Sequence, residues 1–130
     1  MNDTQNIAGA RAAALAGAWA LLVAAALWTS GPETPPAWAW LAAFEGAGGD
    51  KLVHAGLFAV QAWLLCRCRP GPPRAGWLAG CLAAVVAFGA LTEGVQVLLP
   101  GREGDLADLA ADTLGAAAGV AAFAAWRARR

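Results

Sequence analysis

The chain has 130 residues, of which 59% are apolar and 14% charged, and its formal net charge at pH 7 is zero. This length allows one domain at most, and the apolar fraction is well above that of water-soluble domains. Seven Trp, 16 Gly and long Ala, Leu and Val runs are typical of helices in lipid. No basic patch for nucleic acid is indicated, and three cysteines do not support a disulfide framework.

The first apolar stretch runs from Ala12 to Trp28 without a charged residue and stops at the turn-forming sequence Thr29-Ser30-Gly31-Pro32. A membrane core about 30 Å thick is crossed by about 20 apolar residues, so the stretch predicts a spanning helix. A cleaved signal peptide is the alternative, since Ala37-Trp38-Ala39 resembles a cleavage site. The length of the apolar run and a leader with Arg11 as its one basic residue favour a retained helix.

Three further apolar stretches are Leu52–Cys66, Ala75–Leu99 and Leu106–Trp126. The first of them is short and needs its polar ends to lie at the membrane interfaces. Pro70-Gly71 and Pro100-Gly101 predict the turns between the three stretches. The sequence therefore predicts an all-α transmembrane bundle of about four helices, arranged as two helical hairpins.

Charge is strongly segregated along the chain. One predicted side of the membrane holds seven of the nine basic residues, and the other holds eight of the nine acids. Because basic residues in short loops stay cytoplasmic, we expect a multi-pass protein of the cell membrane with both termini in the cytoplasm. Residues 1–11 and 127–130 then form cytoplasmic ends around a membrane domain at residues 12–126. The basic residues are Arg11, Arg67, Arg69, Arg74, Arg127, Arg129 and Arg130; the acids are Glu33, Glu45, Asp50, Glu93, Glu103, Asp105, Asp108 and Asp112.

Polar residues recur at helical spacing near the extracytoplasmic ends of three predicted helices. Ionisable groups in a span are costly to bury, so they face other helices or water and usually serve a function. Residues three or four apart share a helix face, so we expect these groups to form one outward-facing polar pocket. Arg102 is the nearest cation for holding an anionic ligand, and Asp105 is placed as the N-cap of the last helix. The pocket residues are Asp50, Lys51, His54, Glu93, Gln96, Arg102, Asp105, Asp108 and Asp112.

Each residue also has a structural interpretation. Asp50 and Lys51 suit a membrane interface, Asp105 suits a helix cap, and a single histidine is more often a buried polar group than a catalyst. Glu93 and Asp112 lie about two turns inside apolar stretches, which favours a functional role or a polar network. With one histidine and no HExxH pattern, we expect neither a metal nor a cofactor.

The cysteines and two glycine pairs are interpreted as packing residues. Cys66, Cys68 and Cys81 lie in or beside apolar runs, with palmitoylation at a membrane boundary as the alternative. Gly76-x-x-x-Gly80 and Gly115-x-x-x-Gly119 are patterns that let helix backbones approach closely.

The order and spacing of the polar residues resemble the VanZ-like family, named for a protein associated with teicoplanin resistance. The resemblance covers residues 50–119 and implies a small multi-helix membrane protein, sometimes linked to reduced glycopeptide susceptibility, without implying a reaction. Asp112 stands where the family usually has Asn, so a role that needs an amide donor there is in doubt. The motif reads Asp50-Lys51-x-x-His54-x-x-x-Phe58, Glu93-x-x-Gln96, and Pro100-Gly101-Arg102-x-x-Asp105-x-x-Asp108-x-x-x-Asp112-x-x-Gly115-x-x-x-Gly119.

Three functions compete. The first is binding or modulation of a cell-envelope component, with the lipid bilayer and a lipid-linked envelope precursor as partners and an effect on teicoplanin susceptibility. The second is an intramembrane acid/base enzyme that acts on a lipid-linked substrate through His54 and Glu93. The third, a proton-coupled carrier, is disfavoured because the acids gather at one end and no helix is broken at its centre.

Overall fold

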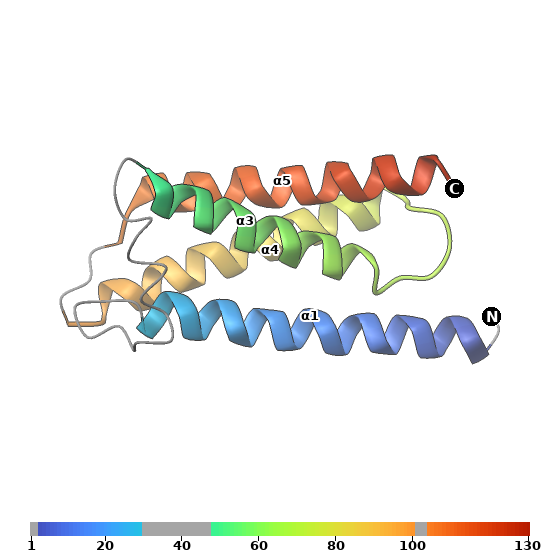
Figure 1. The fold of residues 1–130 in the computed structure, drawn as a ribbon, viewed down its shortest axis with the longest axis horizontal. Helices are drawn as coiled ribbons and strands as arrows, with labels where there is room; N and C mark the ends of the chain where they lie inside the picture. The colour runs from blue at the N-terminus through green and yellow to red at the C-terminus, as the bar shows by residue number, and fades with distance from the viewer. Residues whose placement is uncertain (1–2, 30–47, 101–103) are drawn as a thin grey trace.

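The computed structural model describes residues 3–29, 48–100 and 104–130, and within them all regular secondary structure is helical. The four helices are α1 (Asp3–Thr29), α3 (Gly49–Cys66), α4 (Ala75–Val97) and α5 (Leu106–Ala128). Consecutive helices run in opposite directions, so both ends of the chain lie at the same end of the bundle (Figure 1). The predicted all-α bundle is confirmed.

Three of the helices, α1, α4 and α5, are long and apolar enough to cross a membrane. Helix α3 has 18 residues, a length of about 27 Å at 1.5 Å per residue. Large apolar side chains cover much of the outer surface, as is expected where the solvent is acyl chains. The most exposed are Leu106 at 84%, Leu98 at 81%, Leu52 at 76%, Leu21 at 74% and Leu114 at 70%.

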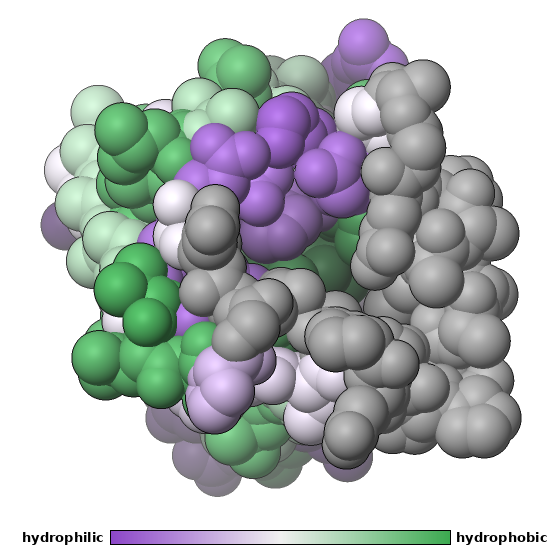
Figure 2. Space-filling view, turned by 90° about the vertical axis from the view of Figure 1, so that its left-hand side faces the viewer, coloured by the Kyte–Doolittle hydropathy of each residue, from purple (hydrophilic) through white to green (hydrophobic). Residues whose placement is uncertain are grey.

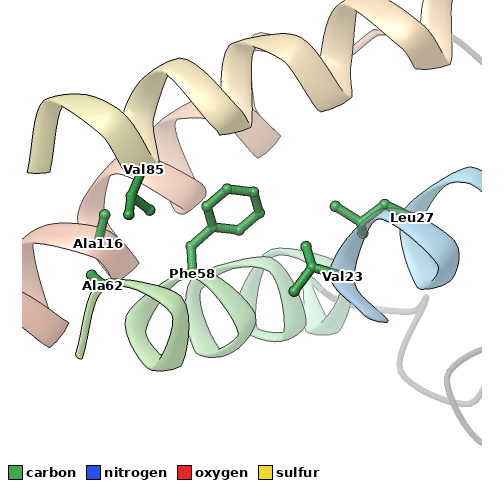
Figure 3. Close-up of a cluster of buried hydrophobic side chains, with 6 residues drawn as sticks. All are labelled: Val23, Leu27, Phe58, Ala62, Val85 and Ala116. Carbon is green, nitrogen blue, oxygen red and sulfur yellow. The ribbon is translucent and has the colours of Figure 1, made fainter. Parts of the chain in front are cut away.

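All four helices contribute to one apolar core (Figure 3). Phe58 of α3 is fully buried, between Val23 of α1 and Val85 of α4. Polar side chains also join α1 to α3, since Trp19 Nε1 donates to the carbonyl of Leu57 at 3.0 Å. The first apolar stretch therefore packs as a helix of the bundle. The core residues are Val23, Leu27, Phe58, Ala62, Val85 and Ala116.

Helix α1 begins at Asp3, well before the predicted start at Ala12. The polar segment ahead of the apolar run is therefore helical, with Asp3 in its first turn. An acid at this position is favourable because the first turn carries unpaired N–H groups and the positive end of the helix dipole.

The closest helix pair is α3 and α5, which are parallel and not consecutive in the chain. Glycines allow this contact: a Cβ on Gly115 would lie 2.7 Å from Ala55 Cα, and one on Gly119 would lie 3.0 Å from Ala59 Cα. Real Cβ atoms do not approach other atoms so closely. The packing role predicted for this glycine pair is confirmed. The α3–α5 contact joins one predicted hairpin to the other, so the bundle is held together between the hairpins as well as within them.

The other glycine pair behaves differently. A Cβ added to Gly76 or Gly80 of α4 would meet no neighbouring atom within 4 Å among the residues described. The predicted packing role was therefore wrong for contacts within this chain, because these glycines face outward.

Aromatic residues gather at the end of the bundle where the chain termini lie. Trp63 of α3 packs against Phe123 and Trp126 of α5, with ring centroids 5.8 and 5.5 Å apart. The guanidinium of Arg130 lies 4.6 Å from the centre of the Trp126 ring. Tryptophan beside arginine is typical of a membrane interface, and the buried Cys66 and Cys81 pack in the same cluster.

Replacing Gly115 by Ala tests the α3–α5 contact. The added methyl group must push the two backbones apart, so we expect Gly115→Ala to lower the free energy of unfolding by about 1–3 kcal/mol. Gly80→Ala adds the same methyl group where there is room and should leave stability nearly unchanged. Thermal unfolding of the purified proteins in detergent compares the two, and equal stability would contradict the close contact.

Candidate functional site

The polar residues meet at the end of the bundle opposite the chain termini. Here the first turns of α3 and α5 lie beside the last turns of α4, because α3 and α5 are parallel and α4 runs against them (Figure 1). Figure 2 looks onto this end and shows a hydrophilic patch bordered by hydrophobic residues. The side chains form two layers, an outer one centred on Lys51 and an inner one centred on Asp112.

In the outer layer, the ammonium group of Lys51 binds three carboxylates. Its Nζ lies 2.8 Å from Asp108 Oδ1, 2.9 Å from Asp105 Oδ2 and 3.4 Å from Asp50 Oδ2. The hydrogen bonds from Lys51 to Asp108 and Asp105 raise the pKa of the lysine. This layer links the first turns of α3 and α5 by charge, and the lysine side chain keeps 37% of its surface exposed.

Asp105 caps helix α5, as predicted from the sequence. Its Oδ1 accepts the backbone N–H of Ala107 at 2.8 Å, which satisfies one of the free donors of the first turn. That bond, followed by the one from Lys51, lowers the pKa of the carboxyl. The backbone N–H of Asp105 donates to Glu93 Oε2 at 3.0 Å, so the same residue ties the end of α4 to the start of α5.

The inner layer lies one helical turn deeper and is buried. His54 Nδ1 lies 2.9 Å from Asp112 Oδ1, a hydrogen bond in which the imidazole N–H donates to the carboxylate. Their side chains are 8% and 0% exposed, and Glu93 is 8% exposed. One nitrogen of His54 and one oxygen of each carboxylate all lie within 4.8 Å of one another. Three helices therefore bring these groups to one point.

Two carboxylate oxygens of this inner layer lack partners. Within the described part of the chain, Asp112 Oδ2 and Glu93 Oε1 are buried and accept no hydrogen bond. Gly89 lies against Asp112, since a Cβ there would be 3.1 Å from Asp112 Oδ2 and 3.3 Å from Phe58 Cε1. A buried charged oxygen without a partner is costly, so this arrangement favours uptake of a proton or a cation.

Two predicted pocket residues stand apart from both layers. Gln96 is buried and its amide donates to the carbonyl of Leu27 at 3.0 Å, which ties α4 to α1. Arg102 lies outside the described residues. Gln61 of α3 is also buried and joins α3 to α1, because its amide donates to the carbonyl of Ala16 at 3.3 Å.

The sequence predicted His54, Glu93 and Asp112 in one polar pocket with six other residues, but it did not group these three as metal ligands. With a single histidine, no spacing along the chain indicates such a group, because the three residues come from three helices. The parallel register of α3 and α5 was the missing information. Its one signal in the sequence was Gly115-x-x-x-Gly119, which does not name the partner helix.

Comparison with known proteins now gives the family. A family model described as VanZ/LLP1 matches residues 10–127. The chain belongs to the VanZ/LLP1 family. The match takes in α1, which the resemblance over residues 50–119 did not cover. Together with the three apolar helices of spanning length, membership identifies a VanZ-like membrane protein. No curated protein and no solved structure matches the chain.

Replacing Lys51 by Gln tests the outer layer. Asp105, with its lowered pKa, contributes stability above the ordinary carboxyl pKa of 3.8, and this is lost as pH falls through its folded value. Lys51, with its raised pKa, contributes below 10.5, and this is lost as pH rises through its folded value. We therefore expect Lys51→Gln to lower the unfolding temperature in detergent by a few degrees at pH 7, and by less at pH 3.

Arg129→Gln removes the same charge at the opposite end of the bundle and serves as the control. It should have a smaller effect than Lys51→Gln at pH 7. A Lys51→Gln effect of equal size at pH 7 and pH 3 would contradict the ionic nature of the outer layer.

Proposed function

We propose that this VanZ/LLP1 member binds or modulates a lipid-linked component of the cell envelope at the outer face of the membrane, and thereby affects susceptibility to teicoplanin. One observation carries the proposal: carboxylates, a lysine and a histidine from three helices converge at one end of a bundle whose core is apolar. A lipid-linked precursor has the same two parts, a polar headgroup at the interface and a hydrocarbon chain in the bilayer.

The apolar surroundings of the polar residues support a lipid-linked ligand. Leu52, Leu98 and Leu106 lie beside the polar helix ends and are 76%, 81% and 84% exposed. A hydrocarbon chain bound there would gain the free energy of apolar contact while its headgroup stays at the polar end. The outward orientation follows from charge bias, with the basic residues of the loops and tail in the cytoplasm.

The charge of the cluster limits which headgroups fit. Among the described residues, five carboxylates face one lysine, so these groups together carry a charge of −4 when the carboxylates are ionised and His54 is neutral. Hydroxyl, amide and amino groups suit this environment as hydrogen-bond donors. A bare phosphate suits it only with a cation between itself and the carboxylates.

The phenotype of three variants tests this function. We expect Glu93→Gln, Asp112→Asn and His54→Ala to reach the membrane in normal amounts and to abolish the protein's effect on teicoplanin susceptibility, measured as the inhibitory concentration for expressing cells. Leu91→Ala is the matched control on α4, because Leu91 is 58% exposed to the apolar surroundings. This control should keep the full effect.

Two results would contradict the proposal. One is full activity in all three variants at normal membrane levels. The other is labelling of Leu106→Cys from the cytoplasmic side only, in a variant free of other cysteines, because the pocket would then face inward.

A second function is favoured by the His54–Asp112 pair. A carboxylate that orients an imidazole, with another buried carboxylate nearby, is an arrangement used in acid/base catalysis. On this proposal His54 acts as the base and Glu93 as the acid on a lipid-linked substrate. We expect purified protein to release phosphate from a polyprenyl diphosphate, with a loss of about 100-fold or more in Glu93→Gln. No turnover by the folded protein, with and without divalent metal ions, would exclude this reaction.

A further inference from the structure

We infer that His54, Glu93 and Asp112 form a binding site for one divalent metal ion of the class of Zn²⁺ or Mn²⁺. They offer one imidazole nitrogen and two carboxylate oxygens, a donor set suited to these ions. The three donor atoms lie within 4.8 Å of one another, and the pair formed by His54 and Asp112 is only 2.9 Å apart.

The geometry is close to what such an ion requires. Ligand atoms about 2.0–2.2 Å from a metal are about 3.0–3.6 Å from one another at octahedral or tetrahedral angles. One contact already lies near this range, and a shift of about 1–1.5 Å in the Glu93 side chain brings in the third donor. Glu93 has a flexible side chain and holds its position through one hydrogen bond, from the backbone N–H of Asp105.

Unsatisfied oxygens give an independent reason to expect a cation. Among the described residues, Asp112 Oδ2 and Glu93 Oε1 are buried without a hydrogen-bond partner, and the two side chains are more than nine-tenths buried. Two ionised carboxylates carry a charge of −2. A proton on His54 leaves −1, whereas a divalent ion with a neutral imidazole leaves zero, and an ion that binds Asp112 Oδ2 and Glu93 Oε1 would also satisfy these oxygens.

The nearest described cation does not meet this need. Lys51 lies in the outer layer, where its ammonium group binds Asp105, Asp108 and Asp50. This acidic outer layer lies at the end of the bundle where Figure 2 shows a hydrophilic patch. Its three carboxylates attract cations to this end, because their charge exceeds that of the lysine.

Three protein ligands leave at least one coordination position open on a four-coordinate ion, as in sites that bind a further ligand. A phosphate oxygen of a lipid headgroup is a ligand of the right charge for that position. This use of the ion rests on the proposed function, whereas the ion site itself does not.

Metal binding by purified, untagged protein in detergent tests the site without any lipid ligand. His54 is the only histidine in the chain, so the ¹⁵N resonances of the imidazole report on this one residue. Addition of Zn²⁺ after treatment with a chelator should shift them and reveal which nitrogen binds. Calorimetry with Zn²⁺ and with Mn²⁺ should give one site per chain for at least one of these ions.

Three variants separate this site from binding elsewhere. Asp112→Asn and Glu93→Gln keep size and shape and should weaken metal affinity by at least about tenfold. Asp3→Asn makes the same chemical change in the first turn of α1, at the far end of the bundle, and should leave the affinity within about threefold. Circular dichroism and gel filtration confirm that each variant is folded.

An absence of Zn²⁺ and Mn²⁺ binding by folded wild-type protein would overturn the inference. Binding that leaves the imidazole resonances unmoved would overturn it as well, even where a variant fails to fold. Metal binding together with a normal teicoplanin phenotype in the Glu93→Gln and Asp112→Asn variants would support the site while contradicting the proposed function.

Discussion

Backbone contact between α3 and α5 sets the arrangement of the whole polar end. Gly115 and Gly119 lack the Cβ atoms that would strike Ala55 and Ala59, so the two helices lie side by side in a fixed parallel register. The contacts follow one another by about one turn on each helix: Lys51 meets Asp108, and three residues further on α3 and four further on α5, His54 meets Asp112. A helix pair held apart by larger side chains could not keep these short polar contacts.

Burial divides the charges of this end into two layers with different requirements. In the outer layer an ammonium group and water share the carboxylates, so ionised groups are tolerated there at moderate cost. Asp112 is fully buried, and among the described residues its side chain is hydrogen-bonded to the imidazole of His54, with the Glu93 carboxylate nearby. The backbone bond from Asp105 to Glu93 joins the layers, because it positions an inner carboxylate by the N-cap of α5.

Local patterns in the sequence predicted most of the helices, because apolar length and turn residues are read along the chain. Helices α4 and α5 begin at the predicted residues and end within two of the predicted ones. The sequence did not predict which helices pack together. The two glycine pairs have the same spacing, yet of the two only Gly115 and Gly119 meet another helix. The choice of partner helix also decides which carboxylates meet His54. The spacing of the acids therefore predicted which residues share a helix face, but not that the trio of His54, Glu93 and Asp112 forms a buried inner layer.

The identity of residue 112 shows how one atom changes the chemistry of this end. The resemblance places Asn there in most of the family, and an amide would offer N–H donors to a neighbouring carboxylate. Asp112 instead presents a second oxygen, which is buried and unpaired among the described residues and lies beside Gly89. Two facing carboxylates repel where one carboxylate and one amide attract. In this chain a proton on one of the three side chains or a bound cation must balance the charge, because none of them is an amide that could donate to the facing carboxylate.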